Sequence, residues 1–126
     1  MDGTPKILLI EDFAAMRKVV FNSLNNLGYK KVTESDSAIK AWDLLQKEDF
    51  DLIISNYNTP EMNGLELLTK IREDSRLKEQ KFIMLTAETD QNILINTKKL
   101  HINAYILKPF KIEVLEAKLN IVLGNA

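Results

Sequence analysis

Two acidic side chains, Glu11 and Asp12, directly follow the apolar run 7–10 near the start of the chain. Carboxylates suit a hard divalent cation such as Mg²⁺, which takes oxygen ligands and keeps several water molecules. The pair also has a simpler interpretation, in which Asp12 caps the helix that follows and Glu11 is solvated. Taken alone, the two acids favour the simpler interpretation.

Polar side chains end three further apolar runs in the same way. They are Asn56 after 51–55, Thr86 after 82–85 and Lys108 after 104–107. A threonine hydroxyl can orient an anion and a lysine ammonium can bind a phosphoryl oxygen, although each residue alone is a weak signal. If the runs are parallel neighbouring strands, all these side chains meet at the edge where open α/β sheets bind their ligands. The bond before Pro109 is a candidate for the cis form.

Apolar runs and amphipathic segments alternate along the chain, which predicts five strand–helix units. The predicted strands cover residues 6–11, a short stretch around 32, 51–55, 81–85 and 104–107. The predicted helices cover 13–27, 38–47, 64–74, 90–101 and 111–123. Strict alternation favours an α/β fold, a doubly wound five-stranded parallel sheet with helices on both faces.

The helices differ in how clearly their buried sides are marked. Gly28 is expected to end the first helix, as a glycine beyond the last turn commonly does. Ile39 and Trp42 are expected to line one side of the second helix, extended by Ala41 and Leu45. The fourth helix has a poor apolar stripe.

Composition narrows the class of protein. A length of 126 residues predicts one domain, 1–126, and 45% apolar residues are ordinary for a globular core. A net charge of −1 gives no reason to expect nucleic acid or an anionic membrane as partner. There is no cysteine, no signal-peptide pattern and no apolar run approaching the ~20 residues of a membrane span. We expect a soluble, cytoplasmic monomer.

Considered together, in this order and at these strand ends, the polar residues resemble the receiver domains of two-component signalling. The likeness is greatest to the CheY-like, single-domain regulators of chemotaxis, and it covers essentially the whole chain. It rests on Glu11-Asp12, the loop 58–64, Thr86-Ala87-Glu88 and Lys108-Pro109-Phe110, with Met16-Arg17, 65–68, Tyr105 and 116–119 as chemotaxis-type features. The resemblance implies the flavodoxin-like (βα)5 fold with strand order 2-1-3-4-5.

The resemblance also implies a phosphorylation switch. In such domains an Asp after the third strand takes a phosphoryl group from a histidine kinase, and Mg²⁺ neutralises the developing charge. By this resemblance, the metal would be held by Asp12, by Glu11 through water and by the carbonyl of Asn58. Thr86 and Lys108 would bind the phosphoryl oxygens and so sense the phosphoryl group. Tyr105 would be the aromatic residue that changes position in the switch. Glu11 replaces the Asp more usual at its position.

The output implied is binding rather than catalysis, so the chain is not expected to be an enzyme. The implied partners are a CheA-like histidine kinase, a FliM-like flagellar motor switch and a phosphatase. The fourth helix, fifth strand and fifth helix would form the output face, with Tyr105 and Lys118 as partner-binding residues.

Asn56 departs from the family pattern, because it occupies the phosphoacceptor position, where Asp is needed. An amide cannot form the acyl phosphate, and the lost charge should weaken Mg²⁺ binding and free Lys108 from a salt bridge. Either Asn56 is an engineered Asp-to-Asn substitution, or the chain is a natural, phosphate-independent pseudo-receiver. The otherwise intact pocket favours substitution.

Without a phosphoryl group we expect a mostly inactive arrangement, with Thr86 away from the pocket centre and Tyr105 outward. A reading from another class is a flavodoxin-like flavin carrier, since the strand order is shared. Against it, no Gly-rich phosphate loop follows the first strand, and Glu11 and Asp12 would repel a phosphate. A DNA-binding regulator is disfavoured because no second domain is seen to carry a helix-turn-helix.

Overall fold

Five parallel strands form one sheet in the order β2-β1-β3-β4-β5, which confirms the predicted fold class and strand order. The computed structural model describes residues 4–87 and 89–124, so Glu88 of the Thr86-Ala87-Glu88 motif lies outside the described residues. The strands are β1 (Ile7–Ile10), β2 (Val32–Ser35), β3 (Leu52–Ser55), β4 (Phe82–Thr86) and β5 (Ala104–Leu107). The helices are α1 (Ala14–Asn26), α2 (Ala38–Leu45), α3 (Gly64–Glu73), α4 (Gln91–Lys99) and α5 (Ile112–Leu123).

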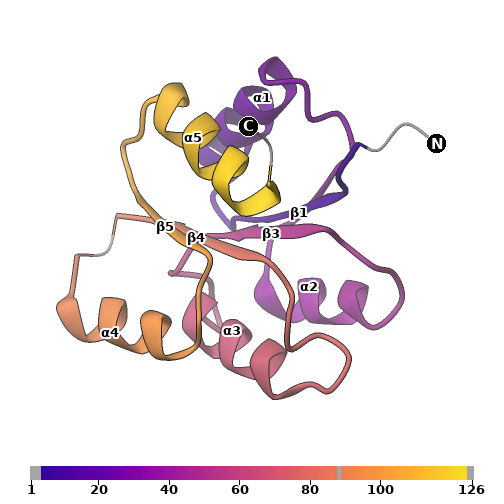
Figure 1. Ribbon diagram of the computed structural model, residues 1–126, viewed down its shortest axis with the longest axis vertical. Coiled ribbons are helices and arrows are strands. Elements are labelled where there is room, and N and C mark those ends of the chain that lie inside the picture. The colour runs from indigo at the N-terminus through magenta and orange to yellow at the C-terminus, as the bar shows by residue number, and fades with distance from the viewer. Residues whose placement is uncertain (1–3, 88, 125–126) are drawn as a thin grey trace.

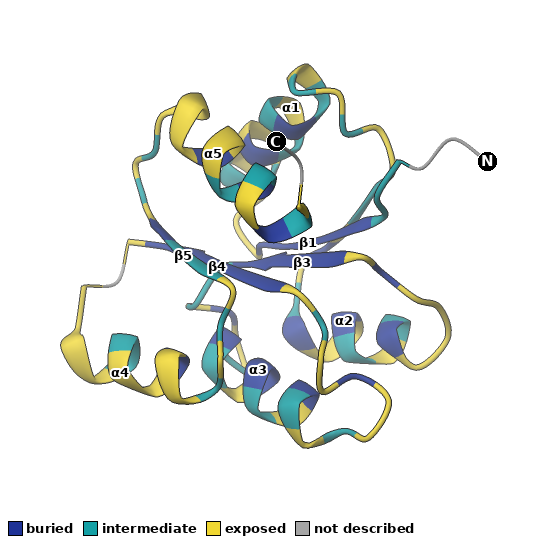
Figure 2. Ribbon diagram, viewed as in Figure 1, coloured by how far each residue is buried: buried dark blue, intermediate teal, exposed yellow. Residues whose placement is uncertain are grey.

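Helices cover both faces of the sheet. α1 and α5 lie on one face, and α2, α3 and α4 lie on the other (Figure 1). Every residue of β1, β3 and β4 is buried, whereas β2 at one edge has a single buried residue (Figure 2). Strands covered on both faces are apolar at nearly every position, which is why the three central strands appear in the sequence as apolar runs, with a buried Ser55 and a buried Thr86 as the last residues of β3 and β4.

Side chains alternate along each strand and so divide the core into two clusters. Ile7 and Leu9 pack with residues of α1 and α5 on one side of the sheet. Leu8 and Ile10 pack with residues of α2 and α3 on the other side. The two clusters hold β1 and β3 between them, so the positions at the ends of these strands are fixed by packing on both faces.

α1 begins one residue later than predicted. Phe13 is the N-cap, and no side chain caps it, so the expectation that Asp12 caps this helix is wrong. The first helical hydrogen bond runs from the Arg17 N–H to the Phe13 carbonyl at 2.9 Å, which leaves Asp12 outside the helix. Gly28 has φ +98° just beyond the end of α1, where a glycine was predicted to end the helix.

α2 presents a different side to the core than predicted. Ala41 and Leu45 are buried as expected, but they share the buried side with Ala38, while Ile39 is 39% exposed and Trp42 is half-buried. The assignment of Ile39 to the buried side was therefore wrong.

α4 is the least embedded helix. Thr97 is the one residue of α4 classed as buried, and Ile95 is 49% exposed, in agreement with the poor apolar stripe of the sequence. Within the described residues, no helix combines the length and apolar character needed to cross a bilayer.

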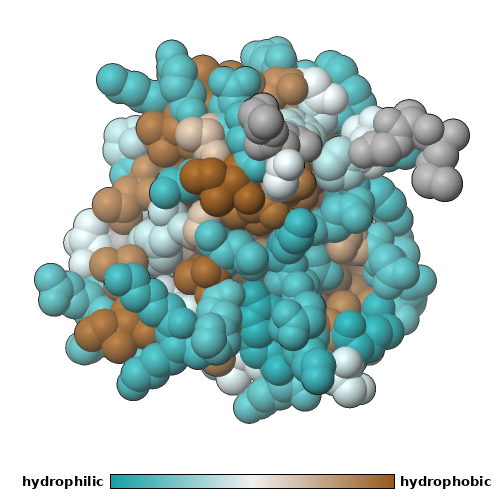
Figure 3. Space-filling view, viewed as in Figure 1, coloured by the Kyte–Doolittle hydropathy of each residue, from teal (hydrophilic) through white to brown (hydrophobic). Residues whose placement is uncertain are grey.

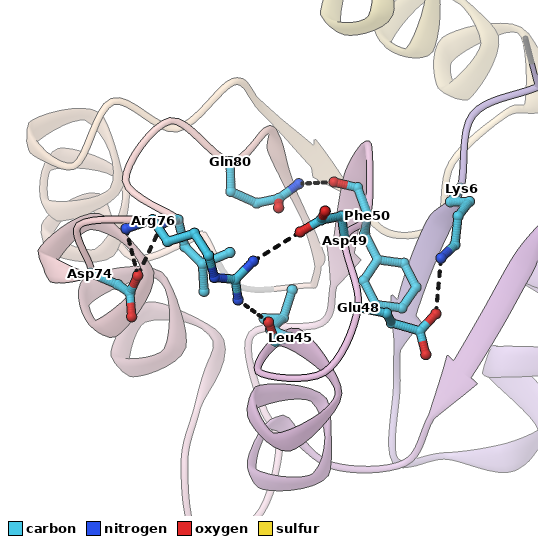
Figure 4. A network of polar contacts seen from close by, with 9 residues as sticks. Lys6, Leu45, Glu48, Asp49, Phe50, Asp74, Arg76 and Gln80 are labelled. Atoms are coloured by element: carbon cyan, nitrogen blue, oxygen red, sulfur yellow. Dashed lines mark hydrogen bonds and ion pairs between the residues drawn. The ribbon is translucent and has the colours of Figure 1, made fainter.

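A network of polar contacts lies at the end of the sheet opposite the predicted site, in the connections that precede β3 and β4 (Figure 4). Arg76, from the connection between α3 and β4, forms a 2.9 Å ion pair with Asp49 and donates to the Leu45 carbonyl. Gln80 donates from Nε2 to the Phe50 carbonyl at 3.0 Å. These contacts join the connections before β3 and β4, but the ion pair is exposed and contributes at most about 1 kcal/mol.

Candidate functional site

The parallel register brings the predicted polar residues to one edge of the sheet. β1 and β3 are aligned so that the Asn56 N–H donates to the Ile10 carbonyl at 3.0 Å. β4 and β5 are aligned so that the Lys108 N–H donates to the Thr86 carbonyl at 2.9 Å. Glu11, the residue after Ile10, therefore lies beside Asn56, and the side chains of Glu11, Asn56 and Lys108 contact one another.

Glu11 is the centre of this convergence. It is only 3% exposed, and its carboxylate accepts three hydrogen bonds. Oε1 accepts from Lys108 Nζ at 2.6 Å, and Oε2 accepts from Asn56 Nδ2 and from the Phe13 N–H, each at 3.2 Å. Charge-assisted bonds of this kind compensate the carboxylate for its removal from water.

Asn56 uses both ends of its amide. Nδ2 donates to Glu11 and also to the Asn58 carbonyl at 3.0 Å, and Oδ1 accepts from Lys108 Nζ at 3.3 Å. Glu11, Asn56, Lys108 and the Asn58 carbonyl thus form a closed set of contacts, which we call the amide network. The expectation that Asn56 frees Lys108 is wrong, because Glu11 supplies the ion pair.

The start of α3 fixes the loop that carries Asn56. Asn63 and Glu66 form a reciprocal capping box, with bonds of 2.8 and 3.0 Å between each side chain and the other residue's backbone N–H. A Cβ added to Gly64 would lie 2.7 Å from the Asn56 carbonyl oxygen and 2.7 Å from Met84 Sδ. Only glycine allows the first turn of α3 to approach the Asn56 backbone this closely.

Arg17 supports the network from α1, a role that the sequence did not indicate. Its Nη1 donates to the Glu11 carbonyl at 2.8 Å, and its Nε lies 3.3 Å from a carboxylate oxygen of Glu34. The guanidinium therefore fixes the backbone from which the Glu11 side chain projects. Met16-Arg17 was noticed as a chemotaxis-type feature, but nothing in that pattern pointed to the carbonyl of Glu11.

Asp12 takes no part in the amide network. It is exposed and borders an open depression. The other residues of that depression are Asn58, Thr59, Pro60, Glu61, Asn63 and Glu66. The two acids of the pair therefore have different environments, one buried and paired and the other exposed.

The oxygen atoms assigned to Mg²⁺ by resemblance are a poor fit for the ion. The Glu11 carboxylate and the Asn58 carbonyl both accept from the Asn56 amide, and Glu11 also holds Lys108. Among residues 4–87 and 89–124, no three His, Cys, Asp or Glu side chains are grouped so that they could hold a metal. Mg²⁺ demands near-ideal octahedral coordination by oxygen ligands. Of the three residues assigned to the ion by resemblance, only Asp12 has its assigned oxygen atoms outside the amide network.

Three further residues were assigned roles by resemblance. Thr86 is fully buried at the end of β4. Tyr105 on β5 is half-buried and packs against the core cluster on the α2 and α3 side of the sheet. Lys118 is half-buried on α5. Their roles in sensing phosphate and binding partners stay predictions. The bond between Lys108 and Pro109 is cis, the form for which the sequence made it a candidate.

Comparisons with known proteins agree with this geometry. Residues 7–120 match the model of a family described as the response regulator receiver domain. Chemotaxis protein CheY1 of Helicobacter pylori is 42% identical over 121 residues, covering 95% of this chain and 98% of that protein. The structure of chemotaxis response regulator CheY4 of Vibrio cholerae has a TM-score of 0.85 and 32% identity, covering 95% of this chain and 99% of that one.

A further similar structure contains a metal. The receiver domain of a sensor histidine kinase from Pseudomonas aeruginosa, solved with a magnesium ion coordinated in its active-site cleft, has a TM-score of 0.86 and 29% identity. The match covers 97% of this chain and 99% of that one.

Proposed function

The chain belongs to the response regulator receiver domain family, and from this premise we propose that it is a CheY-like chemotaxis regulator whose phosphorylation is blocked at Asn56. The observation that carries the proposal is the position of Asn56. It follows β3 directly, and its side chain lies within hydrogen-bonding distance of both Glu11 and Lys108. On this proposal Asn56 occupies the acceptor position of the family, with Glu11, Asp12, Thr86 and Lys108 retained in the chain.

The chemistry of the block is simple. Phosphoryl transfer needs a nucleophile at the acceptor position, and a neutral amide is a very poor one. When bound to a receiver, Mg²⁺ neutralises charge that develops on the transferred group. Here the ion would meet one carboxylate fewer, and Glu11 is already paired with Lys108, so we propose weak Mg²⁺ binding in which Asp12 is the accessible acid.

The proposed partners follow from the chemotaxis assignment. They are a CheA-like kinase, a FliM-like motor switch and a phosphatase, all met in the cytoplasm by a monomeric binding module rather than an enzyme. The output face of α4, β5 and α5 has the apolar surface that such binding needs (Figure 3). Ile95 is 49% exposed on α4, Leu107 48% on β5 and Val114 42% on α5.

The origin of Asn56 has two candidate explanations. An engineered Asp-to-Asn substitution is supported by the survival of Asp12, Thr86 and Lys108 around a position that cannot react. A natural, phosphate-independent pseudo-receiver is supported by the amide network, because both ends of the Asn56 side chain have partners. The sequence of the gene at codon 56 distinguishes the two.

The test of the block compares the unchanged chain with Asn56→Asp. Each is incubated with acetyl phosphate and Mg²⁺, and intact-protein mass spectrometry counts phosphoryl groups. We expect none on the unchanged chain and one, released by hydroxylamine, on Asn56→Asp. An acyl phosphate on the unchanged chain would overturn the proposal.

Peptide mapping is needed as a control, because hydroxyl groups lie close to the site. Ser55 donates from Oγ to the Asn56 carbonyl at 2.9 Å and is fully buried. Thr59 and Thr86 are also buried. Any phosphoryl group on one of these three hydroxyls would be resistant to hydroxylamine, and Ser55→Ala provides the matched background.

A further inference from the structure

Every polar atom at the centre of the site has a partner within the chain. The Asn56 amide has two N–H donors, and they are directed at two oxygens, one from Glu11 and one from the Asn58 backbone. Its carbonyl oxygen faces the Lys108 ammonium, which also holds Glu11. Donors and acceptors are therefore matched inside the amide network.

The same geometry would be unfavourable for a carboxylate at position 56. Nδ2 of Asn56 lies 3.2 Å from Glu11 Oε2 and 3.0 Å from the Asn58 carbonyl oxygen. An ionised Asp in that place would put three acceptor oxygens together with no proton between them. Two of the three oxygens would belong to carboxylates, and like charges at this distance disfavour each other, so such a cluster favours a divalent cation in addition to Lys108.

We propose that the Asn56 amide is an internal replacement for the divalent cation, so that this receiver holds its site together without metal. The two N–H groups of Asn56 occupy the oxygens that a cation would have to draw together. Lys108 supplies the positive charge, and it stays in the site whether or not Mg²⁺ is present. The inference rests on the placement of Asn56 at the acceptor position, but not on the absence of phosphorylation.

Glu11 is the positioning residue of this arrangement. Its carboxylate reaches Lys108, Asn56 and the Phe13 N–H at the same time. An Asp at position 11 is shorter by one carbon–carbon bond, about 1.5 Å, so it would lose at least the contact with Lys108. The longer acid and the amide therefore act together, and each is a departure from the family pattern.

The test measures metal dependence and the state of Lys108 separately. The unchanged chain, Asn56→Asp and Glu11→Asp are each unfolded by heat in EDTA and in Mg²⁺, and Mg²⁺ affinity is measured by calorimetry. The accessibility of Lys108 is followed by an amine-reactive reagent with peptide mapping. Glu61→Gln, which removes an acid from the neighbouring depression but not from the network, is the matched control.

For the unchanged chain and Glu61→Gln, we expect the same unfolding midpoint and the same protection of Lys108 in EDTA and in Mg²⁺. Asn56→Asp should bind Mg²⁺ at least about tenfold more tightly, because a carboxylate charge is restored beside the ion. Its midpoint should rise when Mg²⁺ is added. Glu11→Asp should leave Lys108 reactive, although the net charge is unchanged.

Two outcomes would overturn the inference. One is a Mg²⁺-dependent midpoint in the unchanged chain as large as that of Asn56→Asp, and the other is loss of Lys108 protection when EDTA removes metal. The Lys108 readout needs only the unchanged chain, so the inference stays testable even if Asn56→Asp fails to fold. Phosphorylation of the unchanged chain would defeat the proposed block without altering these readings, so the two failures are distinguishable.

Discussion

At the scale of single residues, the site depends on which atoms at position 56 can donate. An amide nitrogen there donates to Glu11 and to the Asn58 carbonyl, where a carboxylate oxygen would only accept. Glu11 in turn satisfies Lys108, so a buried negative charge and a nearly buried positive charge compensate each other. Removing either partner leaves a charge without compensation in a protein interior.

Lys108→Ala tests that pairing. The side chains of Lys108 and Glu11 are 13% and 4% exposed, so the pair is largely removed from water. We expect the free energy of unfolding in urea to fall by about 3 kcal/mol, because the variant strands a buried carboxylate. In a Glu11→Gln background the same substitution should cost clearly less, and equal costs in the two backgrounds would show that the pair is not coupled.

At the scale of elements, two helix ends determine how the site is held. The first turn of α3 packs against the Asn56 backbone through Gly64. The far end of the same helix is joined to the end of α4 by Arg72, whose guanidinium donates to the carbonyls of Leu100, Gln80 and His101 at 2.7, 2.7 and 3.2 Å. α3 therefore connects the site with the end of α4, a helix of the proposed output face.

Gly64→Ala should destabilise the protein by about 2 kcal/mol in urea unfolding, since an added methyl group overpacks this contact. The double variant Gly64→Ala/Met84→Ala shows whether the Met84 sulfur or the Asn56 carbonyl oxygen causes the destabilisation. Removing Met84 clears the sulfur but leaves the Asn56 carbonyl oxygen, also 2.7 Å from the added Cβ. We expect most of the cost of Gly64→Ala to persist in the Met84→Ala background, because the carbonyl belongs to the backbone of a fixed strand end. Full recovery would show that only the sulfur was in the way.

Arg72→Ala should loosen the junction of α3, α4 and β5. Burial lowers the pKa of the Arg72 guanidinium from its ordinary value, with nearby Glu79 opposing the shift, and the group stays charged at neutral pH. Losing its bonds to backbone carbonyls should cost about 2 kcal/mol and speed amide hydrogen exchange at the C-terminal end of α4.

Arg72→Lys should recover little, because an ammonium cannot reproduce the planar fork of a guanidinium. Glu73→Ala, an exposed neighbour on the same helix, is the control and should change stability by less than about 0.5 kcal/mol. If exchange in α4 is unchanged in Arg72→Ala, then Arg72 does not anchor that helix.

At the scale of the whole molecule, the question is which signalling state the chain populates. Moving a two-state equilibrium from 1:99 to 99:1 needs about 5.5 kcal/mol of differential interaction. The phosphoryl group supplies such a difference in receivers that can be phosphorylated. Here Lys108 is held by Glu11 and Asn56, so no freed lysine is present to favour the active state.

We therefore expect weak binding of a motor-switch peptide by the unchanged chain, with no gain from acetyl phosphate and Mg²⁺. Asn56→Asp should gain affinity at least about tenfold under the same conditions, a difference of ~1.4 kcal/mol. Fluorescence anisotropy of a labelled peptide measures both. Tight binding by the untreated, unchanged chain would favour a pseudo-receiver that binds its partner constitutively.

The fold class and the edge at which the polar residues meet could be predicted from the amino-acid sequence, and the strand order from the family resemblance. Apolar runs marked the central strands, since a strand covered on both faces is apolar at nearly every position. Glu11, Asn56, Thr86 and Lys108 follow directly after such runs, and the carboxyl ends of parallel strands share one edge. These features depend only on neighbours along the chain, so a single sequence contains them.

Which of these residues contact one another is known only from the folded structure. Glu11 and Lys108 are 97 positions apart, and Glu11 and Asn56 are 45 apart, so no local pattern shows that one carboxylate serves both. The same reason explains why Asp12 was mistaken for a helix cap and Ile39 for a core residue. Whether a side chain is buried, paired or exposed depends on distances between elements, and packing of the helices on the sheet sets those distances.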